Sequence, residues 1–210
     1  MAKVLYIKAS PREERSYSHN MAKVFLKAYN EAHPDDTVET LDLWKTDLPA
    51  FDLTASSAKY KIMGGLPHSE EEKVIWEKIV KTIDHFKSAD KYILSSPMWN
   101  FEIPYRLKQY LDIIIQPGFT FSYDPETGYS GLVTGKPVQF ILARGGEYPE
   151  GTPAAAFDHQ TPILKGLFAF MGFTDMSAIL IEPTLMAGPE VAKEKVASLH
   201  EKTKARAKSF

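Results

Sequence analysis

Lys91-Tyr92-Ile93-Leu94-Ser95 is a short, mostly apolar run, and Ser96-Pro97-Met98-Trp99-Asn100-Phe101 follows it directly. The apolar run predicts a buried strand, and residues 106–115 beyond the loop predict a helix. Aromatic rings and an amide therefore gather where a strand ends. Ligands of open α/β sheets bind outside the carboxyl ends of the strands, so this loop is a candidate wall for a flat heteroaromatic cofactor. A proline-rich connection with an exposed tryptophan fits the same residues.

Outward from this loop, strand-like runs alternate with helix-like runs along the chain. The runs near Leu94 and Ile141 are short and apolar, as in a parallel sheet that is buried on both faces. The alternation predicts an α/β protein with a doubly wound, five-stranded parallel sheet and helices on both faces, in one domain over residues 1–210. Predicted strands cover residues 3–8, 37–43, 91–95, 137–143 and 176–181, and predicted helices cover about 18–33, 70–87, 106–115, 154–170 and 189–207.

Two segments are longer than a minimal α/β connection. Residues 44–69 are rich in proline, glycine and serine, and no element is predicted there. Residues 119–123 and 129–133 flank Asp124-Pro125-Glu126-Thr127-Gly128. This pattern predicts an inserted β-hairpin with a five-residue turn.

The composition narrows the range of possible functions. The chain has 25 Lys and Arg against 27 Asp and Glu, for a net charge of −2, so neither a nucleic acid nor a membrane is expected as a partner. It has no cysteine, so redox chemistry would need a bound organic cofactor. The six histidines are scattered, and no metal site is expected. Because the N-terminal apolar run is too short for a signal peptide, a cytoplasmic location is expected.

The loop after the first predicted strand, Ala9 to Asn20, leads into a helix but contains neither a dinucleotide fingerprint nor a Walker A motif. It offers hydroxyl groups and two arginines instead. A helix N-terminus supplies free backbone N–H groups, and serines add donors, so this loop can hold a phosphate without glycines. Ser18 is also a good N-cap, and capping alone would explain that residue. Ser10, Arg12 and Arg15 together are harder to explain in this way and favour phosphate binding.

The fourth predicted strand ends in Ala143-Arg144-Gly145-Gly146. Two glycines let the backbone approach a ligand and point N–H groups at it, which suits the pyrimidine edge of a flavin; an ordinary turn is the alternative. The three loops, in chain order, therefore match the phosphate, the ring face and the ring edge of flavin mononucleotide (FMN).

The chain resembles the FMN-dependent NADH-azoreductases and quinone reductases, which have the flavodoxin-like fold. The resemblance runs along the whole chain, and the second and fourth of its motifs are the most specific. The motifs are Ala9-Ser10-Pro11-Arg12 with Ser16-Tyr17-Ser18, then Pro97-Met98-Trp99-Asn100-Phe101-Glu102-Ile103-Pro104, then Gly131-Leu132-Val133-Thr134-Gly135-Lys136, then Arg144-Gly145-Gly146.

The resemblance implies tightly bound FMN and a homodimer with FMN at its interface. Family members often have a histidine just after the glycine pair, where this chain has Glu147 and Tyr148, and an amide is common at the position of Tyr17. Whether Glu147 or Tyr148 relays a proton stays open. The implied cofactor contacts are Ser10, Ser16, Tyr17 and Ser18 to the phosphate, Met98, Trp99, Asn100 and Phe101 to the isoalloxazine, and Ala143, Arg144, Gly145 and Gly146 to its pyrimidine side.

The implied mechanism is a two-step cycle, in which NADH or NADPH gives a hydride to FMN, leaves, and is replaced by a quinone or an aromatic azo compound. No catalytic side chain is required, because backbone N–H groups of Asn100 or Phe101 and of Gly145 or Gly146 would tune the flavin. A flavodoxin-type electron carrier and a flavin-binding redox sensor are the alternatives. The acceptor used in the cell stays open. For each aromatic residue taken singly, packing in the core is favoured over a roof role. Candidates for an aromatic roof over the flavin, including one that reaches across a dimer, are Phe119, Phe121, Tyr123, Tyr129 and Phe173.

Overall fold

The computed structural model describes residues 1–210, and a five-stranded parallel sheet forms its centre. The strand order β2-β1-β3-β6-β7 places β3, the strand of the quoted stretch, in the middle. In register, Ile7 pairs with Leu94 and Leu94 pairs with Phe140. The predicted sheet is therefore confirmed. Its strands are β1 (Lys3–Lys8), β2 (Thr37–Asp42), β3 (Lys91–Pro97), β6 (Val138–Ala143) and β7 (Met176–Ile181).

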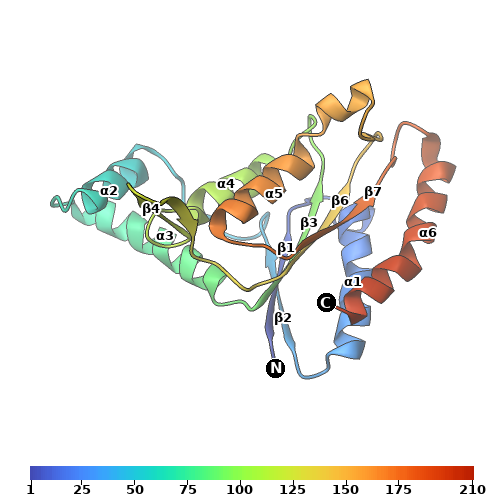
Figure 1. Cartoon of the computed structure of the whole chain (residues 1–210), viewed down its shortest axis with the longest axis horizontal. Coiled ribbons are helices and arrows are strands. Elements are labelled where there is room, and N and C mark those ends of the chain that lie inside the picture. The colour runs from blue at the N-terminus through green and yellow to red at the C-terminus, as the bar shows by residue number, and fades with distance from the viewer.

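Helices cover both faces of the sheet, as Figure 1 shows. Successive side chains of a strand point to opposite faces, so Tyr6 packs in one apolar layer and Ile7 in the other. The layer around Tyr6 includes Phe25 of α1, and the layer around Ile7 includes Phe168 of α5. The doubly wound arrangement is thus confirmed. The helices are α1 (Tyr17–Ala32), α3 (Glu70–Lys87), α4 (Tyr105–Ile114), α5 (Gln160–Met171) and α6 (Gly188–Lys208), and none of them combines the length and apolar character needed to cross a bilayer.

One helix lies where no element was predicted. α2 (Leu53–Met63) starts at Asp52, whose carboxylate accepts the Ala55 N–H at 3.1 Å as an N-cap. It packs against α3, and in Figure 1 the two helices extend beyond the sheet on one side. Lys61 of α2 reaches Glu72 of α3 at 2.7 Å, and this contact holds the pKa of Glu72 below its usual range.

The hairpin and α5 differ from the predictions in their bounds. β4 (Phe121–Asp124) and β5 (Gly128–Gly131) pair antiparallel, so the hairpin is confirmed, but three residues connect its strands instead of five. The Asp124 carboxylate accepts the N–H groups of Glu126 and Thr127, which fixes the turn. The predicted helix over residues 154–170 is a short 3-10 turn, Pro153–Phe157, followed by α5.

Candidate functional site

A cavity of about 440 Å³ opens at the carboxyl edge of the sheet, at the ends of β1, β3 and β6. It brings the three predicted loops together. The segment after β7 also contributes, and this contribution was missed from the sequence. The position of this segment could have indicated the contribution, because it follows a predicted parallel strand and the carboxyl ends of parallel strands lie at the same edge of a sheet. The lining residues are Ser10, Arg12, Ser16, Tyr17, Ser18, Pro97, Met98, Trp99, Ala143, Gly145, Thr184, Leu185 and Pro189.

A second cavity of about 250 Å³ adjoins the first one. The two cavities share Met98, Gly145 and Leu185. The smaller cavity is mainly apolar in character and adds the predicted ring-contact residues that the larger one lacks. Its further lining residues are Asn100, Phe101, Gly146, Tyr148 and Met186.

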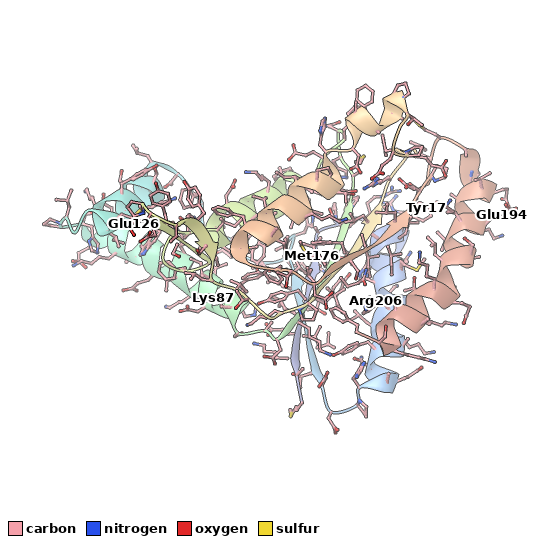
Figure 2. The ribbon with its side chains drawn as sticks, in the orientation of Figure 1. Tyr17, Lys87, Glu126, Met176, Glu194 and Arg206 are labelled. Carbon is pink, nitrogen blue, oxygen red and sulfur yellow. The ribbon has the colours of Figure 1, made fainter.

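The N-terminus of α1 forms one wall of the larger cavity, and Figure 2 labels Tyr17 at this end of the helix. Ser16 is the N-cap, with its hydroxyl accepting the His19 N–H at 3.3 Å, so capping, the alternative offered for Ser18, does not account for that residue. Ser18 Oγ lies 3.3 Å from Ser16 Oγ. The N–H groups of Tyr17 and Ser18 make no hydrogen bond within the chain. Free N–H groups, hydroxyls and the positive end of the helix dipole together suit an anion.

Arg12 lines this end of the cavity, whereas Arg15 does not. Both arginines are exposed on the surface. Of the two basic residues that the sequence offered for a phosphate, the structure therefore brings only Arg12 to the cavity.

Asn100 and Phe101 form a tight turn in the left-handed backbone region, with φ of 48° and 69°. Trp99 and Glu102 close the turn through two backbone hydrogen bonds, of 2.9 and 3.0 Å. The left-handed region costs most residues other than glycine about 1–2 kcal/mol, and asparagine less because its short polar side chain can hydrogen-bond locally. The N–H groups of Asn100 and Phe101 make no hydrogen bond within the chain, so the strained turn presents two neighbouring donors.

Gly145 and Gly146 also have N–H groups without a hydrogen-bond partner in the chain. Neither residue has a positive φ, so the turn that needs left-handed glycines does not form here. A Cβ on Gly146 would lie 2.7 Å from the sulfur of Met186, and glycine at this position therefore makes room for the loop after β7. That loop is attached here, because Gly145 O accepts the N–H groups of Leu185 and Met186.

Arg144, the remaining predicted contact of this loop, lines neither cavity. It is fully buried and meets Asp158 at 3.0 Å and Glu182 at 3.2 Å, with Gln160 and Thr161 as further partners. Burial raises the pKa of Glu182, and Arg144 acts in the opposite direction. The backbone of Arg144 is also engaged, because its N–H donates to Ile181 O at 3.0 Å and its carbonyl accepts from Thr184, so Arg144 offers no free polar group to a ligand in the cavity.

The five predicted roof aromatics lie outside both cavities. Phe173 is buried in the core against Phe86, Tyr92 and Phe168, the packing that was favoured for it over a place in the roof. Phe119 is half-buried beside Trp76. Phe121, Tyr123 and Tyr129 belong to the hairpin, where both tyrosines are exposed. The aromatic residues that line the smaller cavity are Phe101 and Tyr148, whose ring centroids lie 6.4 Å apart.

These features define an α/β protein with a doubly wound parallel sheet and a pocket at the carboxyl edge of that sheet. The family model described as "Flavodoxin-like fold" matches residues 2–207. An FMN-dependent NADH:quinone oxidoreductase from Nitratidesulfovibrio vulgaris is 51% identical over 210 residues, which cover 100% of each chain.

Two solved structures agree with this match over nearly the whole chain. An azoreductase from Bacillus anthracis has a TM-score of 0.92 at 36% identity, covering 100% of both chains. An FMN-dependent NADH-azoreductase from the same species, in complex with FMN, has a TM-score of 0.89 at 30% identity, covering 99% of this chain and 98% of that one. The chain belongs to the flavodoxin-fold family of FMN-dependent NADH:quinone oxidoreductases and azoreductases.

Proposed function

We propose that this protein is an FMN-dependent NAD(P)H oxidoreductase that reduces quinones and aromatic azo compounds. The observation that carries the proposal is the donor set of the two adjoining cavities: hydroxyls and free N–H groups at the N-terminus of α1 line the larger one, and the residues with the two pairs of free N–H groups line the smaller one. A phosphate tail and a flat ring with polar edges fit this set. The cysteine-free chain offers no competing redox group of its own.

Each loop has a distinct part in holding FMN. Ser10, Ser16, Tyr17 and Ser18 bind the phosphate through hydroxyl and N–H groups, with Arg12 adding a positive charge. Met98 and Trp99 lie along the ring, while Asn100 and Phe101 donate N–H groups to one edge. The backbone from Ala143 to Gly146 meets the pyrimidine edge.

The chemistry comes from the cofactor: FMN, when bound, accepts a hydride from NADH or NADPH and passes electrons to the next occupant of the same site. The chain's own contribution is to orient and to stabilise. The four N–H groups of Asn100, Phe101, Gly145 and Gly146 are fixed before any ligand arrives, so they stabilise negative charge on the ring at no reorganisation cost. No side chain acts as a dedicated acid or base in this proposal.

The smaller cavity suits the flat acceptor, because it is lined by Met98, Phe101, Tyr148, Leu185 and Met186. Several of these side chains are largely exposed, Leu185 at 77% and Met186 at 79%. Exposed apolar side chains around a site favour a partner surface, and a homodimer that covers this edge is part of the proposal.

The test is to add NADH without oxygen to the FMN-supplemented protein and to follow the visible flavin band. We expect prompt bleaching, and recovery of the band when a quinone or an azo dye is added. Flavin that binds but resists bleaching by NADH would favour an electron carrier or a redox sensor. Failure to bind FMN would refute the proposal.

Replacing Asn100 by alanine is expected to weaken FMN binding about fivefold, since the left-handed turn becomes about 1 kcal/mol less favourable. Asn100→Gly is the matched control, because glycine adopts positive φ freely but has no side chain. If the backbone N–H is the contact, Asn100→Gly keeps the FMN affinity of the unmodified protein. Fluorescence titration of FMN measures both variants, and an unchanged affinity in Asn100→Ala would contradict the assignment.

A further inference from the structure

We infer that Arg144 is a positioning residue, which holds both pairs of ring-facing N–H groups in place from outside the cavity. The inference rests on the proposed FMN site and concerns how the chain builds it. Arg144 does not line either cavity, yet its side chain and backbone connect the segments that do.

The guanidinium of Arg144 is buried among polar partners. Its side chain is 1% exposed and contacts carboxylates from two distant segments, Asp158 before α5 and Glu182 after β7. Gln160 Oε1 accepts its Nε–H at 3.2 Å, and the Thr161 hydroxyl accepts a further bond. Buried charges persist only when paired and hydrogen-bonded, so this cluster has one well-defined arrangement.

The residues on either side of Asp158 contact the strained turn at Asn100 and Phe101. Phe157, next to Asp158, packs its ring 5.0 Å from that of Phe101. His159, on the other side, donates its N–H to Phe101 O at 3.1 Å. A left-handed turn without glycine persists only when its surroundings impose it. Phe157 and His159 provide these surroundings. Asp158 lies between them, and Arg144 holds Asp158 in place.

Arg144 is also connected to the glycine pair, through the loop after β7. Its own carbonyl accepts the Thr184 N–H at 2.8 Å and the Thr184 hydroxyl at 2.7 Å. The guanidinium contacts Glu182, which lies two residues before Thr184. Gly145 O accepts the N–H groups of Leu185 and Met186, the two residues after Thr184. The loop after β7 and the peptide units of Gly145 and Gly146 are therefore locked together around one side chain.

A lysine at this position would keep the charge but not the geometry. Arginine presents five N–H donors in a rigid fork, whereas lysine carries a compact ammonium that cannot reach several planar partners at once. Arg144→Lys is therefore the informative substitution. It separates the role of the fork from the role of the charge, and it leaves neither carboxylate without a nearby cation.

Arg206→Lys is the matched control. Arg206 also bonds to the sheet by side chain, through Gln139 at 3.0 Å and Ser177 at 3.1 Å, on β6 and β7. Figure 2 labels it near the far end of α6, away from Tyr17. It touches neither cavity.

The experiment measures the FMN dissociation constant and the midpoint potential of bound FMN in both variants, with circular dichroism to verify folding. For Arg144→Lys we expect the dissociation constant to rise about tenfold or more, as when hydrogen bonds to a charged group are lost. The potential should become more negative, because misplaced donors weaken binding of the reduced, negatively charged ring more than of the oxidised ring. If the affinity for reduced FMN falls tenfold more than the affinity for oxidised FMN, the midpoint potential falls by about 30 mV for a two-electron couple. Arg206→Lys should match the unmodified protein in both quantities.

A folded Arg144→Lys variant with unchanged affinity and potential would overturn the inference, as would equal losses in Arg206→Lys. If Arg144→Lys does not fold, Asp158→Asn replaces it, since the amide oxygen still caps α5 through Thr161 while the charge facing Arg144 is gone. Failure of both variants to fold would also overturn the inference, because Arg144 would then serve the fold as a whole. Absence of FMN binding in the unmodified protein would refute the proposed function instead.

Discussion

Replacing Gly131 by alanine is expected to lower the free energy of unfolding by about 3 kcal/mol, the upper end of the range for overpacking. A Cβ at Gly131 would overlap the backbone N and Cα of Gly172 and lie 2.5 Å from the carbonyl carbon of Met171. These are backbone atoms, so no rotamer change relieves the clash. The hairpin would have to move away from α5, and the Val133 N–H bond to Met171 O, 2.8 Å long, would be strained or lost.

Gly166→Ala is the matched control for this substitution. Gly166 lies inside α5, and a Cβ there would meet no atom within 4 Å. Because alanine is the better helix former, this variant should gain about 0.5–1 kcal/mol. Urea unfolding followed by circular dichroism measures both. A Gly131→Ala variant as stable as the unmodified protein would contradict the close approach of the hairpin and α5.

Replacing Ser16 by aspartate is expected to abolish FMN binding at micromolar concentrations without destabilising the apoprotein. Aspartate is as good an N-cap as serine, so α1 keeps its start. The carboxylate would stand in the cavity wall beside Ser18 Oγ, where the phosphate is proposed to bind. At an effective dielectric constant of about 20, two unit charges about 4 Å apart repel by about 4 kcal/mol. The expected loss of affinity is roughly 1000-fold.

Two controls isolate this charge effect. Ser16→Asn caps the helix equally well and adds no charge, so it should bind FMN far better than Ser16→Asp. Riboflavin has the same ring but no phosphate, so Ser16→Asp should leave its binding unchanged. Fluorescence quenching titrations of the unmodified protein and of the two variants give these affinities. A Ser16→Asp variant that binds FMN within tenfold of the unmodified protein would place the phosphate elsewhere.

The sheet was predictable because buried parallel strands leave a clear apolar signal, whereas α2 left almost none. Its buried side chains are the small Ala55 and Ala58, while the large Leu53, Tyr60 and Met63 are exposed. The helix therefore lacks the stripe of large apolar residues on which periodicity depends. The signals that remained were Asp52 at its N-cap and Gly64 just after its end.

The site was predictable as a set of loops but not as a set of side-chain directions. Motif and position placed Arg144 beside the cofactor, and the structure turns its side chain toward two carboxylates far away in sequence. Likewise, Ser16 and Ser18 are both acceptable caps, and the backbone at Ser16 decides between them. Single-sequence patterns report local preference and periodicity, whereas these choices depend on tertiary contacts.

The composition of the larger cavity wall bears on how the affinity for a ligand depends on pH. None of its side chains is a histidine, an aspartate or a glutamate, the groups that ordinarily change charge between about pH 4 and 8. A phosphomonoester, in contrast, takes up its second proton near pH 6. Of the groups in direct contact at this wall, the phosphate is therefore the one that changes charge across this range, and the pocket would register how many negative charges the arriving phosphate carries.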